Sequence, residues 1–172
     1  MNKMKLMILF LTVWFGGQAY AHGPTPQKVD ESITMTAPAE AVWQIIGQFD
    51  AIADWHPQVK SAEKIDETTR QITLDNDQQI TESLDDRNSG TFLLSYRLLE
   101  ENFAAIPVSF YTITLQAHAA DDNETTVSWQ GRFYRADTGN FPPEELNDEA
   151  AVKAMTAFAK AGLQGIKDAV EK

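Results

Sequence analysis

Six consecutive segments in the middle of the chain alternate apolar and polar residues, and this pattern constrains the fold more than any other feature of the sequence. Clusters of turn-forming residues separate the segments; Asp75-Asn76-Asp77 and Asp121-Asp122-Asn123 are two of them. Alternation with period two is typical of strands that bury one face, and polar turns between such strands predict antiparallel hairpins. The six expected strands are residues 59–66, 70–74, 79–86, 91–99, 108–118 and 125–134.

A seventh strand and three helices flank this region. Residues 29–35 alternate in the same way, residues 39–46 and 51–55 are expected to form short helices, and Pro57 ends the second one. Residues 148–170 carry apolar side chains at helical spacing. We therefore predict an α+β fold: a seven-stranded curved antiparallel sheet wrapped around one long C-terminal helix, with two short helices after the first strand. A strongly curved sheet around one helix is hard to fill, so we expect a cavity between them.

The first residues have the pattern of a secretory signal peptide. Lys3 and Lys5 make a basic start, residues 6–15 are almost entirely apolar, and Ala19-Tyr20-Ala21 supplies a small-x-small cleavage site. The apolar run is too short to span a bilayer, so we expect no membrane span in the mature protein. The sequence thus predicts cleavage between Ala21 and His22 and a periplasmic location. The expected organisation is a signal peptide over 1–21, an extended leader over 22–28 and a single domain over 29–172.

Charge and cysteine content narrow the classes of partner. The formal net charge is −11, and loss of the two lysines in the signal peptide would make it −13. Nucleic acids and anionic membranes repel such a chain, because binding to them relies on Lys and Arg. Basic proteins are the natural electrostatic partners, although an acidic surface also serves solubility alone. The chain has no cysteine, which excludes disulfides and thiolate metal sites.

The inward faces of the expected strands supply candidate pocket residues. Alternation places Tyr96, Tyr111, Trp129 and Phe133 on the apolar faces of their strands, together with one acid, Glu82. A carboxylate on an apolar face must be paired, hydrated in a cavity or raised in pKa. Glu82 is therefore either a ligand anchor or a general acid/base. The alternatives are a register shift by one residue or a place at the open rim of the sheet.

His56 lies between Trp55 and Pro57, and three roles compete for it. As a general base it would need a partner, and Asp54 is the only acid nearby in sequence. As a metal ligand it would need further donors, but no HxH or HxxxH spacing exists. As a structural or pocket-rim residue it would close the helix pair, with Trp55 inserted into the core. A copper site at His22, the expected mature N-terminus, is a weak further candidate, and no cofactor motif is present.

A set of residues spread over the chain carries a resemblance to known proteins. It consists of Ala37-Pro38-Ala39-Glu40-Ala41-Val42-Trp43, Phe49 to Trp55-His56-Pro57, Glu82 with Leu84, Tyr96, Pro107-Val108 through Tyr111, and residues 127–133. In these positions the chain resembles the SRPBCC superfamily, and within it the polyketide cyclase/dehydrase-like (START-like) branch. Residues 22–33, at the expected mature N-terminus, also resemble periplasmic methanol-oxidation accessory proteins of the MxaD type.

The resemblance implies a helix-grip fold with a hydrophobic ligand cavity under the C-terminal helix. For the narrower group it implies a periplasmic role that assists electron transfer between methanol dehydrogenase and its cytochrome c, without catalysing the oxidation. Our first hypothesis is a non-enzymatic periplasmic protein that binds a small hydrophobic ligand, a redox partner, or both. The alternative is a cyclase/dehydrase-like or hydrolase-like enzyme that uses His56 and Glu82. The expected pocket residues are Trp55, His56, Glu82, Tyr96, Tyr111, Trp129 and Phe133.

Overall fold

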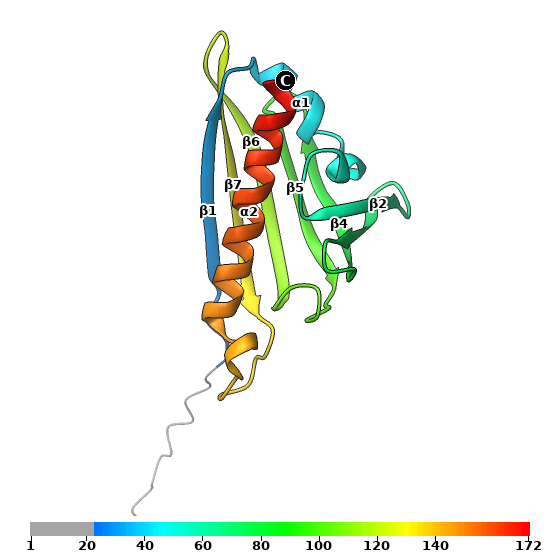
Figure 1. The fold of residues 1–172 in the computed structure, drawn as a ribbon, viewed down its shortest axis with the longest axis vertical. Coiled ribbons are helices and arrows are strands. Elements are labelled where there is room, and N and C mark those ends of the chain that lie inside the picture. Colours follow the sequence, from blue (N-terminus) through cyan, green and yellow to red (C-terminus); the bar gives the residue numbers. More distant parts are fainter. Residues whose placement is uncertain (1–22) are drawn as a thin grey trace, which may run out of the picture.

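Seven antiparallel strands form one curved sheet, and one long helix lies along its concave face (Figure 1). The computed structural model describes residues 23–172. The strand order is β1-β7-β6-β5-β4-β3-β2, so β1 and β2 are the two edges. The predicted α+β helix-grip architecture is confirmed. The strands are β1 (Gln27–Met35), β2 (Val59–Lys64), β3 (Thr69–Leu74), β4 (Gln79–Asn88), β5 (Leu93–Glu100), β6 (Val108–Asp121) and β7 (Glu124–Arg135).

The helices follow from local signals at their ends. Helix α1 (Ala39–Ile46) begins after Pro38, whose fixed φ suits a helix start. Helix α2 (Asp148–Val170) is capped by the Asn147 side chain, which accepts a hydrogen bond of 2.9 Å from the Ala150 amide. Asp148 and Glu149 lie in its first turn, where negative charge stabilises the helix dipole.

Alternation decides which side chains face α2. On β7, Val127, Trp129 and Phe133 are buried, while Gln130 and Arg132 between them are exposed. The expected inward residues of β4, β5 and β6 are buried in the same way, except Leu84 and Phe92, which are half-buried. These side chains and the inner face of α2 form one continuous apolar core. The buried α2 residues are Ala151, Met155, Phe158, Ala159, Gly162, Leu163 and Ile166.

Two glycines let α2 lie very close to the chain around His56. A Cβ atom built on Gly162 would lie 2.8 Å from His56 Cδ2. A Cβ atom on Gly165 would overlap the carbonyl oxygen of Trp55 and lie 3.0 Å from Pro57 Cδ. The absence of side chains at these two positions therefore fixes how near the helix comes to residues 55–57.

Several predicted boundaries were wrong by a few residues. The second short helix is a 3-10 helix, η1 (Phe49–Asp54), instead of residues 51–55. Gln27 and Lys28, assigned to the leader, pair with Phe133 and Arg132 in the sheet. Strands such as β6 run past their apolar stretch, because backbone pairing continues where side chains are already polar. A short 3-10 helix, η2 (Glu144–Leu146), was not predicted. The expected signal peptide (1–21) and His22 lie outside the described residues.

Candidate functional site

The acid on the apolar face, Glu82, forms a buried ion pair with Arg70. The two residues lie directly opposite each other on β4 and β3. Arg70 Nε donates to Glu82 Oε2 at 2.7 Å, and Nη2 lies 2.6 Å from the same oxygen. Each residue is only 1% exposed. Glu82 therefore faces inward as alternation predicted, and pairing removes much of the cost of burying its charge.

The remaining polar atoms of this ion pair have partners of their own. The Tyr111 hydroxyl donates to Glu82 Oε1 at 2.5 Å, and Arg70 Nη1 donates to the carbonyl of Phe49. Burial, and then the nearby Glu82 charge, raise the pKa of Tyr111 well above its usual range, so its proton stays on the hydroxyl. The Arg70 guanidinium also lies 4.1 Å from the ring centre of Phe49 and 4.8 Å from that of Tyr96. The whole arrangement is a closed, neutral network.

His56 lies in an aromatic cluster with both ring nitrogens bonded to backbone. Its ring stacks on Phe158 with centres 4.0 Å apart and meets Trp129 edge-on at 5.9 Å. Nδ1 accepts a hydrogen bond of 3.2 Å from the Gln58 amide. Nε2 therefore carries the proton in the neutral ring and donates to the Phe158 carbonyl at 3.1 Å. Burial is the main cause that lowers the pKa of His56 from 6.5 to about 4.

This histidine predicts an acid-dependent loss of stability. In the unfolded chain its imidazole binds a proton below pH 6.5, whereas the folded protein binds it only below about pH 4. The unfolded state thus holds the extra proton in that window, and the free energy of unfolding should fall by about 3 kcal/mol as pH decreases through it. We expect His56→Gln to remove this pH dependence in denaturant titrations at pH 7, 5.5 and 4. His118→Gln, a change at an exposed histidine, is the control. If the free energy of unfolding of H56Q still fell with pH as it does in the original protein, the pH dependence would not come from His56.

The acid/base pair of His56 and Glu82, which the alternative hypothesis requires, is not formed. His56 is bonded to the backbone of Gln58 and Phe158, while both carboxylate oxygens of Glu82 are held by Arg70 and Tyr111. The sequence placed the two side chains correctly inside the fold. It did not show that each already has other partners.

Apart from Arg70 Nη2, which lies against Glu82 in the ion pair, three buried donors in the same region lack an acceptor in the described part of the chain. They are the indole N–H groups of Trp55 and Trp129 and the hydroxyl of Tyr96. Tyr96 is 1% exposed and Trp129 is fully buried. Burial, followed by the charge of Glu82, raises the pKa of Tyr96, so its hydroxyl keeps its proton as well. Buried donors without partners are rare in native proteins, and each costs about 1–3 kcal/mol.

The seven expected pocket residues are all buried, and a small cleft leads toward them. This cleft has a volume of about 170 Å³ and lies between α2, the β3–β4 turn and the β5–β6 loop. Phe158 lines it, and the Phe158 ring stacks on His56. Phe158 therefore borders both the cleft and the aromatic cluster. Its other lining residues are Gln58, Leu74, Asp75, Ala105, Ile106, Pro107, Ala154 and Ala157.

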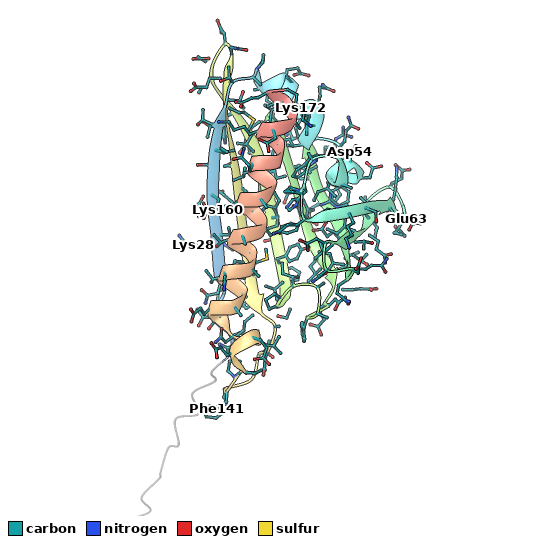
Figure 2. All side chains as sticks on the ribbon, in the orientation of Figure 1. Lys28, Asp54, Glu63, Phe141, Lys160 and Lys172 are labelled. Atoms are coloured by element: carbon teal, nitrogen blue, oxygen red, sulfur yellow. The ribbon has the colours of Figure 1, made fainter. Side chains whose placement is uncertain are left out.

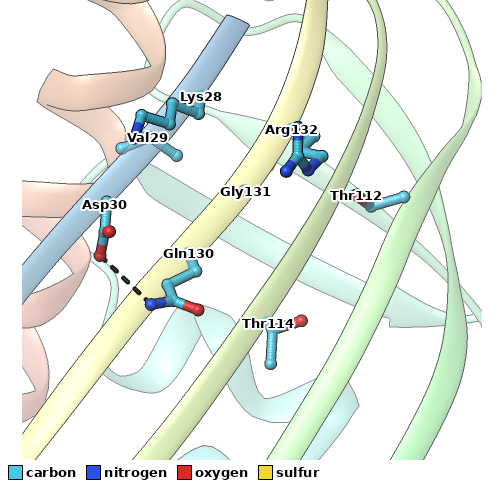
Figure 3. A pocket seen from close by; sticks show the side chains of 8 residues that line it. All are labelled: Lys28, Val29, Asp30, Thr112, Thr114, Gln130, Gly131 and Arg132. Carbon is cyan, nitrogen blue, oxygen red and sulfur yellow. Dashed lines mark hydrogen bonds between the residues drawn. The ribbon is translucent and has the colours of Figure 1, made fainter. Parts of the chain in front are cut away.

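A larger groove, of about 350 Å³, lies on the outer face of the sheet, away from α2 (Figure 3). Lys28 and Arg132 lie opposite each other there, and neither forms an ion pair with another residue in 23–172. Asp30 accepts a hydrogen bond of 3.3 Å from Gln130 in the same groove. The groove is polar, and none of the expected pocket residues lines it.

Sequence reasoning missed three residues of the buried site. Arg70 precedes Ile72 and Leu74 at alternate positions, so the same pattern that singled out Glu82 could have identified it. Phe49 was named only among the residues of the family resemblance, and no contact was predicted for it. Phe158 was recognised as a core residue of the long helix, but nothing in the sequence shows that it meets His56.

Within residues 23–172, no group of three or more His, Asp or Glu side chains is arranged to hold a metal ion. The described helices include none that is both long and apolar enough to cross a membrane.

The comparisons with known proteins agree with this geometry. The chain resembles an uncharacterised protein of Bacillus thuringiensis, with 25% identity, a TM-score of 0.72, and coverage of 85% of this chain and 100% of the other. It resembles the protein XoxI of Bacillus cereus at 26% identity and a TM-score of 0.72, over 84% and 96% of the two chains. The Zhui aromatase/cyclase of Streptomyces sp. R1128 shares the fold at 20% identity and a TM-score of 0.68, over 86% and 94%. No curated protein matches the chain.

The family described as polyketide cyclase / dehydrase and lipid transport matches residues 26–171, which is nearly all of the described chain. The buried ion pair, the aromatic cluster and the sheet that holds them all lie within this match. The chain belongs to the polyketide cyclase / dehydrase and lipid transport family.

Proposed function

We propose that this chain is a non-catalytic periplasmic binding protein that holds a small, largely apolar ligand between the sheet and α2. The unpartnered donors of Trp55, Trp129 and Tyr96 are the observation that carries the proposal. A ligand with a carbonyl or ether oxygen would give these donors an acceptor, and its apolar part would pack on the surrounding rings. The ligand would thus be an aromatic or alicyclic molecule with at least one oxygen acceptor.

The cleft beside Phe158 supports a route into this interior. Its volume of about 170 Å³ is comparable to apolar cavities that hold one benzene-sized molecule, about 150 Å³. A larger ligand would require the Phe158 side chain to rotate into the cleft. The ring is 8% exposed, so it lies at the boundary between the core and the opening.

Binding fits the site better than catalysis does. A general base must be free to take a proton from the substrate, and His56 uses both ring nitrogens in bonds to backbone. The carboxylate of Glu82 is held by Arg70 and Tyr111. The His56–Glu82 enzyme therefore gains no support from the geometry.

An accessory role in a periplasmic redox system is the second part of the proposal. The basic and apolar N-terminal sequence supports export, and the similarity to XoxI at 26% identity supports a relationship to accessory proteins of the MxaD type. The net charge of −11, or −13 without the two lysines of the expected signal peptide, would steer a basic dehydrogenase or cytochrome c toward this protein. We propose no cofactor for the protein itself.

The ligand proposal is tested by native mass spectrometry of the mature protein purified from its own periplasm. A stoichiometric bound molecule, released on denaturation and bearing an oxygen acceptor, is the expected result. Rebinding to the Phe158→Ala variant should be faster than to the original protein, because the ring no longer closes the cleft. A protein that is empty as isolated and binds no aromatic ketone or phenol would overturn the proposal.

A pair of matched substitutions tests the unpartnered hydroxyl. Tyr96→Phe removes a hydroxyl without a partner, so the empty protein should keep its stability or gain about 1 kcal/mol. Tyr111→Phe removes a hydroxyl that donates to Glu82, so it should lose about 1–3 kcal/mol. Urea unfolding of ligand-free protein measures both. Equal losses in the two variants would show that Tyr96 is already satisfied without a ligand.

A further inference from the structure

Acidic side chains greatly outnumber basic ones in the β5–β6 loop and in the segment after β7. Residues 99–103 and 134–149 contain seven acidic side chains and one basic one, Arg135. Arg135 is itself paired with Asp148 at 2.8 Å. Both segments lie at the end of the sheet where β5 ends, β6 begins and β7 ends, and the Ala136 amide donates to the carbonyl of Pro107 in the β5–β6 loop at 3.0 Å. We call residues 99–103, Phe110 and residues 134–149 the loop-end surface.

Exposed apolar side chains lie on the same surface. Phe141 is 97% exposed, and Figure 2 shows it at the lower tip of the molecule. Leu99 and Phe110 are also exposed. Arg97 on β5 pairs with Thr112 on β6, and Leu99 and Phe110 lie two residues further along these strands, so they share the outer face of the sheet. Phe103 is exposed in the β5–β6 loop. Four of the five large apolar side chains that are exposed in residues 23–172 therefore belong to this surface.

A cleft at this end offers a place for a cationic side chain. It has a volume of about 400 Å³ and is lined by Glu144, Glu145, Asn147, Glu149, Ala150 and Lys153. None of its three acids forms an ion pair with another described residue. A Lys or Arg from a partner could enter between carboxylates that are still free to bind it.

We propose that the loop-end surface is the docking site for a protein partner whose own contact face has an apolar centre and a basic rim. Exposed aromatic residues inside a charged border are the usual anatomy of a transient protein interface. Charge complementarity selects the partner, because this surface repels anionic membranes, nucleic acids and a second copy of itself. The inference rests on the accessory part of the proposed function and is independent of the interior ligand.

The test is an NMR titration of the isotope-labelled mature protein with reduced mitochondrial cytochrome c, a basic protein, at low salt. Amide shifts should change mainly in residues 99–103 and 134–149, and the changes should disappear at about 0.3 M salt. Shifts that gather elsewhere on the protein would overturn the docking site but leave the accessory role. No shifts at any salt concentration would overturn both.

Matched variants separate a local surface from overall charge. Glu144→Lys with Glu145→Lys should weaken binding at least tenfold. Glu63→Lys with Glu67→Lys makes the same charge change at Glu63 on β2 (Figure 2) and at Glu67 in the β2–β3 turn, and should change binding less than threefold. Phe141→Ser should also weaken binding. Ile65 is 54% exposed at the β2–β3 turn, and Ile65→Ser should not weaken binding. Equal effects of the test and control variants would overturn the proposal. Phe141 is so exposed that its replacement should leave the fold intact.

Discussion

Replacing Glu82 with glutamine should reduce the free energy of unfolding by about 3–5 kcal/mol, because it leaves the Arg70 charge buried without its partner. The side chains are 2% and 1% exposed, so water cannot take over the role of the carboxylate. Glutamine keeps the shape of glutamate, which limits the change to the charge and its hydrogen bonds. Urea unfolding at pH 7, followed by circular dichroism, measures the loss.

Two further variants serve as controls for E82Q. Asp85→Asn breaks the surface pair between Asp85 and Arg97, whose side chains are 27% and 49% exposed, and should cost no more than about 1 kcal/mol. The double variant Arg70→Met with Glu82→Leu should cost less than E82Q, because no charge is left unpaired. A loss in E82Q as small as that in D85N would mean that the ion pair is hydrated, contrary to the structure.

Replacing Gly165 with alanine should destabilise the protein by about 3 kcal/mol, although the same change in an exposed helix normally stabilises by about 1 kcal/mol. The added methyl group would collide with the Trp55 carbonyl oxygen and press on Pro57. Both are held by the chain that leads into β2, so α2 would have to move away from the sheet. The measurement is again urea unfolding, and the reversed sign is the decisive feature.

Gln164→Ala is the control for helix propensity. Gln164 is exposed on the neighbouring position of α2, so its replacement should change stability by less than about 0.5 kcal/mol. A neutral or stabilising G165A variant would show that α2 can shift without cost, and the close approach to residues 55–57 would then not be a constraint.

Local patterns were enough to predict the fold and part of the site. Alternation identified every strand, and it placed Glu82 on the buried face although glutamate is rarely found there. A three-residue turn over Asp75-Asn76-Asp77 places Leu74 opposite Gln78. Four residues further from the turn on each strand, Arg70 then lies opposite Glu82. That ion pair could therefore have been predicted from the sequence.

The surroundings of His56 could not be predicted in this way. Its partner Phe158 is 102 residues away, and the contact depends on how α2 rotates and how closely it approaches the sheet. Two glycines set that approach, and a glycine in a helix shows only that some contact is close, without showing with what. The unpartnered donors of Trp55, Trp129 and Tyr96 likewise depend on the final packing of side chains from distant elements.

The pairing of β1 with β7 has a consequence for how the chain folds. Asp30 lies opposite Gln130, so the first strand can join the sheet only after about three quarters of the chain has been synthesised. The core closes later still, when α2 arrives at the very end. Closing such long loops is entropically costly, and sheets built from distant pairings fold slowly. In a nascent chain of this topology, β1 stays unpaired and the concave face of the sheet stays uncovered until synthesis is almost complete.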